Sequence, residues 1–312
     1  MVYSTLISPE NLHKHVYDPH WYIFDCRFAL ADPEQGRRDY EKGHISGALY
    51  ADLDKDLCGP IRTRPGRFTE TAVLTGRHPL PDVDTFVATL NRWGVTNNTQ
   101  VVAYDDKGGG LAAARLWWML RWVGHDPVAV LDGGWQGWIG KQYPVSSGQY
   151  SVSSEQLEVS RQLAGKPFRA QVRPELLATT EDVQAMMGDP ERLIVDSRTP
   201  ERYRGEIEPI DPVAGRIPGA ANVAYGDTQT ANGFFRPAQA LKEQFEQLLD
   251  NVSPQNTVFY CGSGVTAAAS LLAMKHAGLG DGKLYAGSWS EWIADPNRPI
   301  EKGEPFRNFY GR

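Results

Sequence analysis

The segment Leu193-Ile-Val-Asp196-Ser-Arg198 repeats the pattern of Trp21-Tyr-Ile-Phe-Asp25-Cys-Arg27. In both segments a short apolar run is followed by an aspartate and, two residues later, by an arginine. Runs of this kind, rich in β-branched or aromatic residues, are typical of buried strands. The recurrence of one strand signature in both halves of a 312-residue chain indicates a duplicated domain.

Three further pairs of segments match in the same order along both halves. They are Gly43-His-Ile-Ser-Gly47 with Gly215-Arg-Ile-Pro-Gly219, Val101-Val-Ala-Tyr-Asp105 with Thr257-Val-Phe-Tyr-Cys261, and Leu131-Asp-Gly-Gly-Trp135 with Leu284-Tyr-Ala-Gly-Ser-Trp289. A Ser/Gly-rich stretch at 146–154 separates the halves and reads as the start of a linker. We therefore predict domains at residues 1–147 and 167–312, joined by a linker at 148–166.

Short apolar runs alternate with longer amphipathic stretches in each half. Val258-Phe-Tyr260 is expected to form a strand, and 266–277 a helix that ends at Gly278. This alternation predicts an α/β fold in which a mainly parallel sheet is flanked by helices on both faces. Such sheets bind ligands at the carboxyl ends of their strands, where Cys261 lies.

Composition narrows the class of protein. Hydrophobic content of 41% with 22% charged residues is typical of a globular protein, and a net charge of -6 offers no basic field for nucleic acid. No run of about 18 apolar residues suggests a membrane span, so a cytoplasmic location is expected by default. The three cysteines include no C-x-x-C pair, so neither a disulfide framework nor a zinc site is predicted.

The loop that follows the second-half strand carries the predicted chemistry. Cys261 is followed by Gly262-Ser-Gly264-Val265-Thr266 and then by the predicted helix. The two glycines allow successive backbone N–H groups to turn toward one centre, and the helix start adds positive potential. A cysteine there is predicted to be a thiolate that could carry a second sulfur as a persulfide, rather than a cysteine buried for packing.

These motifs resemble the two-domain sulfurtransferases of the rhodanese superfamily, over nearly the whole chain. The loop 261–267 is similar to that of 3-mercaptopyruvate sulfurtransferases, and the segments 196–219 and 285–292 resemble two family signatures. The resemblance implies a ping-pong enzyme that takes sulfane sulfur from a small anionic donor and passes it to cyanide or a thiol. It implies no organic cofactor, no metal and no nucleic-acid or membrane partner.

The resemblance also implies roles for individual residues. Arg202 matches an arginine that family members direct at the donor anion, and Gly262, Gly264, Val265 and Thr266 are placed with it in substrate binding. Ser263, His78 and Asp54 match a charge-relay group proposed for mercaptopyruvate enzymes. A turn-forming serine and an ordinary loop histidine are the competing interpretations of Ser263 and His78.

The sequence departs from the mercaptopyruvate pattern after Glu208-Pro209. The family usually carries a second substrate arginine there, whereas this chain has Ile210, so 3-mercaptopyruvate and thiosulfate both stay open as donors. Arg216 replaces a usual histidine and is considered as a source of nearby positive charge. The first-half loop begins with Asp105, which cannot hold a persulfide, so that half is predicted to be inactive.

Two other functions occur on related folds. A dual-specificity phosphatase needs an arginine after five residues that follow the cysteine, and position 267 is alanine, so this activity is disfavoured. A non-catalytic rhodanese-type binding module is the main alternative. The intact glycine loop around Cys261 argues for an enzyme instead.

Overall fold

The computed structural model describes residues 2–64, 72–73, 75–148 and 166–304. They divide into two compact α/β units. The first unit consists of Met1–Gly59, Pro81–Arg173 and Ala231–Phe235, and the second of Pro60–Leu80, Pro174–Thr230 and Arg236–Arg312. Each unit thus includes a short segment from the other half of the chain. Most of the predicted linker at 148–166 lies outside the described residues.

The first unit is built on a five-stranded parallel sheet. Its strands, in spatial order, are β1 (Leu6–Ile7), β8 (Val128–Leu131), β7 (Gln100–Tyr104), β2 (Trp21–Asp25) and β4 (Leu49–Tyr50). Its helices are α1 (Pro9–His13), α2 (Gln35–Lys42), α3 (Leu53–Asp56), α4 (Val83–Trp93), α5 (Ala112–Trp122) and α6 (Gly134–Gly140). A short antiparallel pair joins β3 (His44–Ile45) to β9 (Val145–Ser146).

The second unit repeats this plan with a second five-stranded parallel sheet. Its order is β10 (Leu177–Ala178), β14 (Lys283–Tyr285), β13 (Thr257–Tyr260), β11 (Leu193–Asp196) and β12 (Ala221–Asn222). Its α-helices are α8 (Thr180–Met186), α9 (Pro200–Arg204), α10 (Ala238–Leu249), α11 (Ala267–His276) and α12 (Ser288–Trp292). The described residues of this unit also form the 3₁₀ turns η1 (Pro174–Leu176), η2 (Tyr225–Thr228) and η3 (Pro254–Asn256). The strands β5 (Thr63–Arg64) and β6 (Ala72–Val73) form an antiparallel pair.

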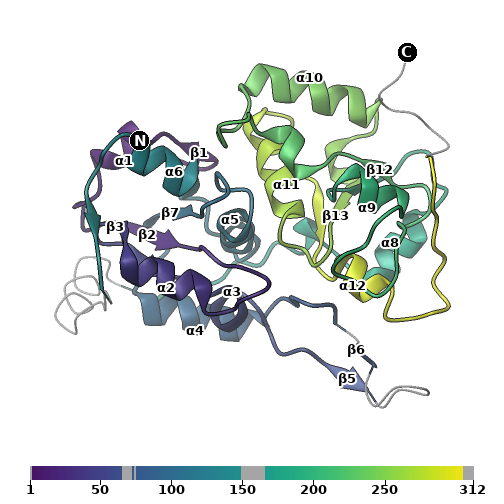
Figure 1. The fold of residues 1–312 in the computed structure, drawn as a ribbon, viewed down its shortest axis with the longest axis horizontal. Helices are drawn as coiled ribbons and strands as arrows, with labels where there is room; N and C mark the ends of the chain where they lie inside the picture. The colour runs from purple at the N-terminus through teal and green to yellow at the C-terminus, as the bar shows by residue number, and fades with distance from the viewer. Residues whose placement is uncertain (1, 65–71, 74, 149–165, 305–312) are drawn as a thin grey trace. The chain divides into compact units, whose positions relative to one another are not determined.

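Helices cover both faces of the second sheet. Figure 1 shows α10 and α11 on one side of β13, and α8, α9 and α12 on the other. On the second side, Val183, Tyr203 and Trp289 pack with Val258 and Tyr260 in one buried cluster. The predicted fold class, a parallel sheet with helices on both faces in each half, is confirmed. The predicted strand at 258–260 and helix from 266 are confirmed as β13 and α11.

In each unit, one buried arginine connects the end of a strand of the sheet to a nearby turn. In the first unit, Nη2 of Arg27 donates to the Asp25 carboxylate and to the Gly43 carbonyl, both at 2.6 Å. Its guanidinium lies 4.5 Å from the ring centroid of Trp135, as a cation–π contact. The repeated Asp-x-Arg pattern therefore encodes a cross-link between a strand end, a turn and an aromatic ring.

The second unit contains the same cross-link. Arg198 donates to Asp196 and to the Gly215 carbonyl, again at 2.6 Å, and its guanidinium lies 4.7 Å from the ring centroid of Trp289. Both members of this ion pair are buried, so removal of one partner would leave an uncompensated charge, at a typical cost of about 3–5 kcal/mol. The match between the units is the structural counterpart of the sequence repeat.

The loop after β7 encloses a carboxylate. Asp105 is fully buried, and its two oxygens accept backbone N–H bonds at 2.8–3.3 Å. The donors are Lys107, Gly109, Leu111 and Ala113. Burial raises the pKa of this carboxyl, while the N–H bonds act in the opposite direction. In the first unit, therefore, the loop amides converge on an acceptor that the chain itself provides.

We predict that Asp105→Ala lowers the free energy of unfolding by about 3 kcal/mol, because four backbone N–H groups, two of them buried, lose their acceptor. Urea unfolding of the wild type and the variant measures this difference. Asp105→Asn, which keeps one acceptor oxygen, is expected to lose less. A loss below about 1 kcal/mol for the alanine variant would mean that these N–H groups find other acceptors.

Candidate active site

Cys261 lies where β13 ends, in the loop that leads into α11. The side chain is buried, with 2% of the residue exposed. Gly264 has φ +74, and a Cβ there would lie 2.3 Å from the carbonyl oxygen of Ala286, so only glycine fits. The loop is thus pressed against the chain that follows β14, with its amides turned toward the sulfur.

Hydrogen bonds to the sulfur offset its burial. Burial is the largest influence on the pKa of Cys261 and raises it. The Thr266 hydroxyl and the backbone N–H groups of Ser263, Ala267 and Gly264 act in the opposite direction, and together they bring the pKa below its ordinary value. The N–H of Gly264 lies 3.2 Å from Sγ. The adjacent Val265 is also buried and completes the turn into the helix.

The turn that leads into α12 is hydrogen-bonded to the backbone of Cys261 and Gly262. The backbone N–H of Cys261 donates to Oγ of Ser288 at 3.0 Å, and its carbonyl accepts the N–H of Trp289 at 3.0 Å. The next carbonyl, that of Gly262, accepts the N–H of Ser290. Ser288 adopts φ 54, a left-handed conformation that is rare for a residue with a Cβ. These contacts fix the loop backbone independently of any ligand.

His78 is joined to the loop by a hydrogen bond of 2.7 Å between its Nδ1 and Oγ of Ser263. Both side chains are buried. The segment that carries His78 belongs to the second unit, and it is held there by Gly76, where a Cβ would lie 2.7 Å from the Gly287 carbonyl oxygen. Two residues paired in the sequence analysis only by resemblance therefore lie in contact.

Asp54, the third member of the predicted relay, lies on α3 of the first unit. The residue is exposed, and its backbone N–H donates to the side chain of Asp52. Its part in proton transfer stays a prediction.

Arg202 projects from α9 beside the loop. A Cβ built on Gly262 would lie 3.6 Å from its Nη2 and 3.7 Å from its Nη1. The edge formed by Nε and Nη2 is occupied by the carboxylate of Glu208, at 2.6–3.1 Å, and Nη2 also donates to Asp211 at 3.1 Å. Acidic neighbours therefore hold the guanidinium in place. Only Nη1 is left to donate to a ligand, so Arg202 cannot bind a carboxylate through two parallel hydrogen bonds from its Nε–Nη2 edge.

Arg77 is a candidate residue that the sequence analysis missed. Its Nη1 pairs with Asp211, and its Nη2 lies 3.0 Å from the Cβ position of Gly262. Its Nε is buried and has no hydrogen-bond partner among the residues that the structure describes. Nη2, in contrast, lies beside the loop, where it can donate to an anion. Its position immediately before His78 was the available signal, and only the fold shows that both reach the loop.

The arginine in place of the usual histidine, Arg216, does not supply free positive charge to the site. The residue is fully buried, its Nη1 donates to the Gly303 carbonyl at 2.6 Å, and its Nη2 pairs with Glu301. The guanidinium stacks 4.4 Å from the ring centroid of Tyr203. The expectation that Arg216 supplies positive charge near the site is wrong, because its hydrogen bonds and ion pair connect it to the chain after α12. Ile210, which stands where the family usually has a second substrate arginine, is 44% exposed.

The other cysteines are poor nucleophiles. Cys26 is fully buried, and burial raises its pKa well above the ordinary value. Burial also raises the pKa of Cys58 to about 11. Trp117, Trp118 and Trp122 are buried on α5. Within the described ranges, no cluster of three or more His, Cys, Asp or Glu side chains is arranged to hold a metal ion.

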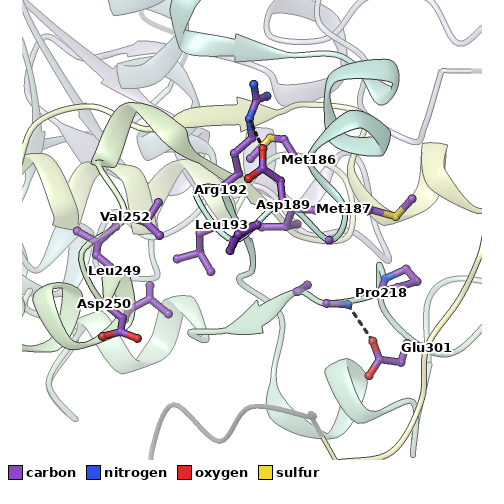
Figure 2. Close-up of a pocket in the computed structure, with 16 residues that line it drawn as sticks. Met186, Met187, Asp189, Arg192, Leu193, Pro218, Leu249, Asp250, Val252 and Glu301 are labelled. Atoms are coloured by element: carbon purple, nitrogen blue, oxygen red, sulfur yellow. Dashed lines mark hydrogen bonds and ion pairs between the residues drawn. The ribbon is translucent and has the colours of Figure 1, made fainter.

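A pocket of about 280 Å³ lies elsewhere in the second unit. Figure 2 shows its lining, which includes Met186, Leu193, Leu249 and Glu301. Leu193 is the first residue of β11, whereas Cys261 follows the last residue of the neighbouring parallel strand. The pocket is therefore at the opposite edge of the sheet from the reactive loop. Among the described helices, none has the length and apolar character needed to cross a membrane.

Comparison with known proteins places this geometry in a family. The model of the rhodanese-like domain matches the chain twice, at residues 8–141 and 179–295. The chain belongs to the rhodanese superfamily. A Pseudomonas aeruginosa relative named "Probable 3-mercaptopyruvate sulfurtransferase" is 41% identical over 302 residues, which cover 96% of this chain and 99% of the relative.

Two more rhodanese-superfamily proteins support this placement. Human 3-mercaptopyruvate sulfurtransferase is 34% identical over 294 residues, covering 92% of this chain and 88% of the human protein. The crystal structure of SseA from Escherichia coli, described as a 3-mercaptopyruvate sulfotransferase, superposes with a TM-score of 0.71 at 28% identity, covering 93% of this chain and 100% of that one. The predicted membership of the two-domain rhodanese-superfamily sulfurtransferases is confirmed.

We predict that Cys261 reacts with iodoacetamide with a pH midpoint below the value of about 8.5 typical of a free thiol. Thr266→Val is expected to raise that midpoint, because the variant removes a hydroxyl that lowers the pKa of the thiol. Alkylation rates against pH, followed by mass spectrometry, measure both midpoints. Cys261→Ser should abolish labelling at pH 7, and an ordinary midpoint in the wild type would contradict the prediction.

Proposed function

We propose that this protein transfers sulfane sulfur from 3-mercaptopyruvate to cyanide or a thiol acceptor, with the sulfur held on Cys261 as a persulfide. The observation that carries the proposal is the set of N–H and O–H donors that lower the pKa of a buried cysteine. Donors aimed at a fixed point stabilise an anion there without further reorganisation. A persulfide is an anion of this kind, one sulfur longer than the thiolate.

The first half-reaction can be written with its atoms balanced. The Cys261 thiolate attacks the donor sulfur, the carbon–sulfur bond of the donor breaks, and its electron pair passes to the pyruvate enolate. The donor thiol proton then has to move from sulfur to the methylene carbon, which gives pyruvate and the persulfide anion. In the second half-reaction the acceptor attacks the outer sulfur and releases the thiolate.

The contact between His78 and Ser263 suits this proton transfer. The serine hydroxyl lies in the loop beside Cys261, and the imidazole beyond it is hydrogen-bonded to that hydroxyl at 2.7 Å. A hydroxyl backed by an imidazole can relay a proton in either direction near neutral pH.

Two arginines support a donor with a carboxylate. Nη2 of Arg77 and Nη1 of Arg202 both lie near the Cβ position of Gly262, where each can donate an N–H bond to one carboxylate. This arrangement offers a second cation although Ile210 stands where relatives usually have one. Thiosulfate is the second candidate donor, because its sulfur transfer releases sulfite and needs no proton relay.

We predict that incubation with 3-mercaptopyruvate adds the mass of one sulfur atom to the wild-type protein, and that cyanide removes it. Intact-protein mass spectrometry under non-reducing conditions measures the change, and thiosulfate is tested in parallel. Cys261→Ser should gain no sulfur, since the nucleophile is absent. If the wild type gains no sulfur from either donor, the non-catalytic binding module becomes the better explanation.

We predict that His78→Ala lowers kcat for 3-mercaptopyruvate by about 100-fold, a typical loss when a general acid–base group is removed. Thiosulfate turnover is expected to fall much less, because that donor carries no proton that must be moved. Steady-state rates with both donors measure the split. Equal losses with the two donors would assign His78 a structural role.

A further inference from the structure

Asp211 occupies an unusual position beside the reactive loop. Its side chain is 2% exposed, and it forms ion pairs with both Arg77 and Arg202. The two arginines come from segments far apart in the sequence, and a Cβ on Gly262 would approach both. One buried carboxylate is thus shared by the two cations that flank the candidate donor site.

Asp211 belongs to a cluster whose charges cancel. Its members are three arginines and three carboxylates: Arg77, Arg198, Arg202, Asp196, Glu208 and Asp211. Without the Asp196–Arg198 pair, two guanidinium groups and two carboxylates lie nearest the loop, and their charges also sum to zero. A cluster with no net charge attracts an anion mainly through the direction of its free N–H groups. It has no excess positive charge to balance the second negative charge of a dianionic ligand.

Asp211 also determines which N–H groups are free. By pairing with Nη1 of Arg77 it leaves Nη2 of that guanidinium beside Gly262. By pairing with Nη2 of Arg202, together with Glu208, it leaves only Nη1 of that arginine for a ligand. These two groups, Nη2 of Arg77 and Nη1 of Arg202, match the two oxygens of one planar carboxylate better than the tetrahedral, doubly charged end of thiosulfate.

We propose that Asp211 is a positioning residue that determines donor specificity: by bridging Arg77 and Arg202 it selects a monocarboxylate donor over a dianionic one. The proposal rests on the proposed sulfurtransfer at Cys261. Asp211 neither touches the sulfur nor moves a proton, so its effect is on donor binding and not on the chemical step.

The test is Asp211→Asn, assayed with 3-mercaptopyruvate and with thiosulfate. Loss of one negative charge gives the cluster a net positive charge, and the Arg77 guanidinium loses the carboxylate that fixes its direction. KM for 3-mercaptopyruvate is expected to rise about 10-fold with kcat changed less than about 3-fold. The ratio of kcat/KM for thiosulfate to that for 3-mercaptopyruvate is expected to rise at least 10-fold.

Asp189→Asn is the matched control. Asp189 also pairs with an arginine of the second unit, Arg192 at 3.2 Å, and it lines the pocket in Figure 2 at the other edge of the sheet. This variant removes the same charge from the unit and is expected to leave the donor ratio unchanged. If Asp211→Asn does not fold, Asp211→Ser, which removes the charge with a smaller side chain, is measured instead.

The outcomes separate this inference from the proposed function. A donor ratio within 3-fold of the wild type, or equal losses of kcat with both donors, would overturn the role of Asp211 while sulfur loading of the wild type still supports the transferase. Absence of sulfur loading in the wild type would overturn the proposed function and this inference with it. A shift of the ratio in Asp189→Asn as large as in Asp211→Asn would assign the effect to general charge.

Discussion

The reactive loop depends on one constraint, that backbone N–H groups at the carboxyl end of a central strand converge on a negatively charged atom. In the first unit that atom belongs to the Asp105 carboxylate, and in the second it is the sulfur of Cys261. In the first loop, the Asp105 carboxylate is the acceptor of these N–H bonds. In the second loop the acceptor is the Cys261 sulfur, which in the proposed function binds and releases a second sulfur atom. The same backbone arrangement thus serves structure in one unit and suits chemistry in the other.

The remainder of each unit holds that loop in place. The buried Asp-x-Arg cross-link joins a strand end, a turn and a tryptophan, and the same tryptophan backbone donates to the first carbonyl of the loop: Trp135 to Asp105 and Trp289 to Cys261. In the second unit the strained Ser288 adds a hydrogen bond to the cysteine backbone. The duplication therefore preserves the frame around the loop even though the side chain at its first position differs.

The charged groups around the second loop show how specificity can be separated from reactivity. The donors that lower the pKa of Cys261 are backbone groups and one hydroxyl, all local to the loop. The groups suited to a donor anion are guanidinium N–H groups supplied by α9 and by the segment around Gly76, and acidic partners fix their directions. A change in those acidic partners can alter which anion fits without altering the nucleophile.

The sequence by itself determined the duplication, the α/β class, the strand–loop–helix around Cys261 and its glycine requirement, because these depend on periodicity and on short-range backbone geometry. The tertiary structure decided which side chains meet: the contact of His78 with Ser263, the approach of Arg77 to Gly262, the occupation of Arg202 by Glu208 and the burial of Arg216. These pairings join residues up to 185 positions apart. Composition and spacing carry no record of such distances, since they arise only when the segments fold against one another.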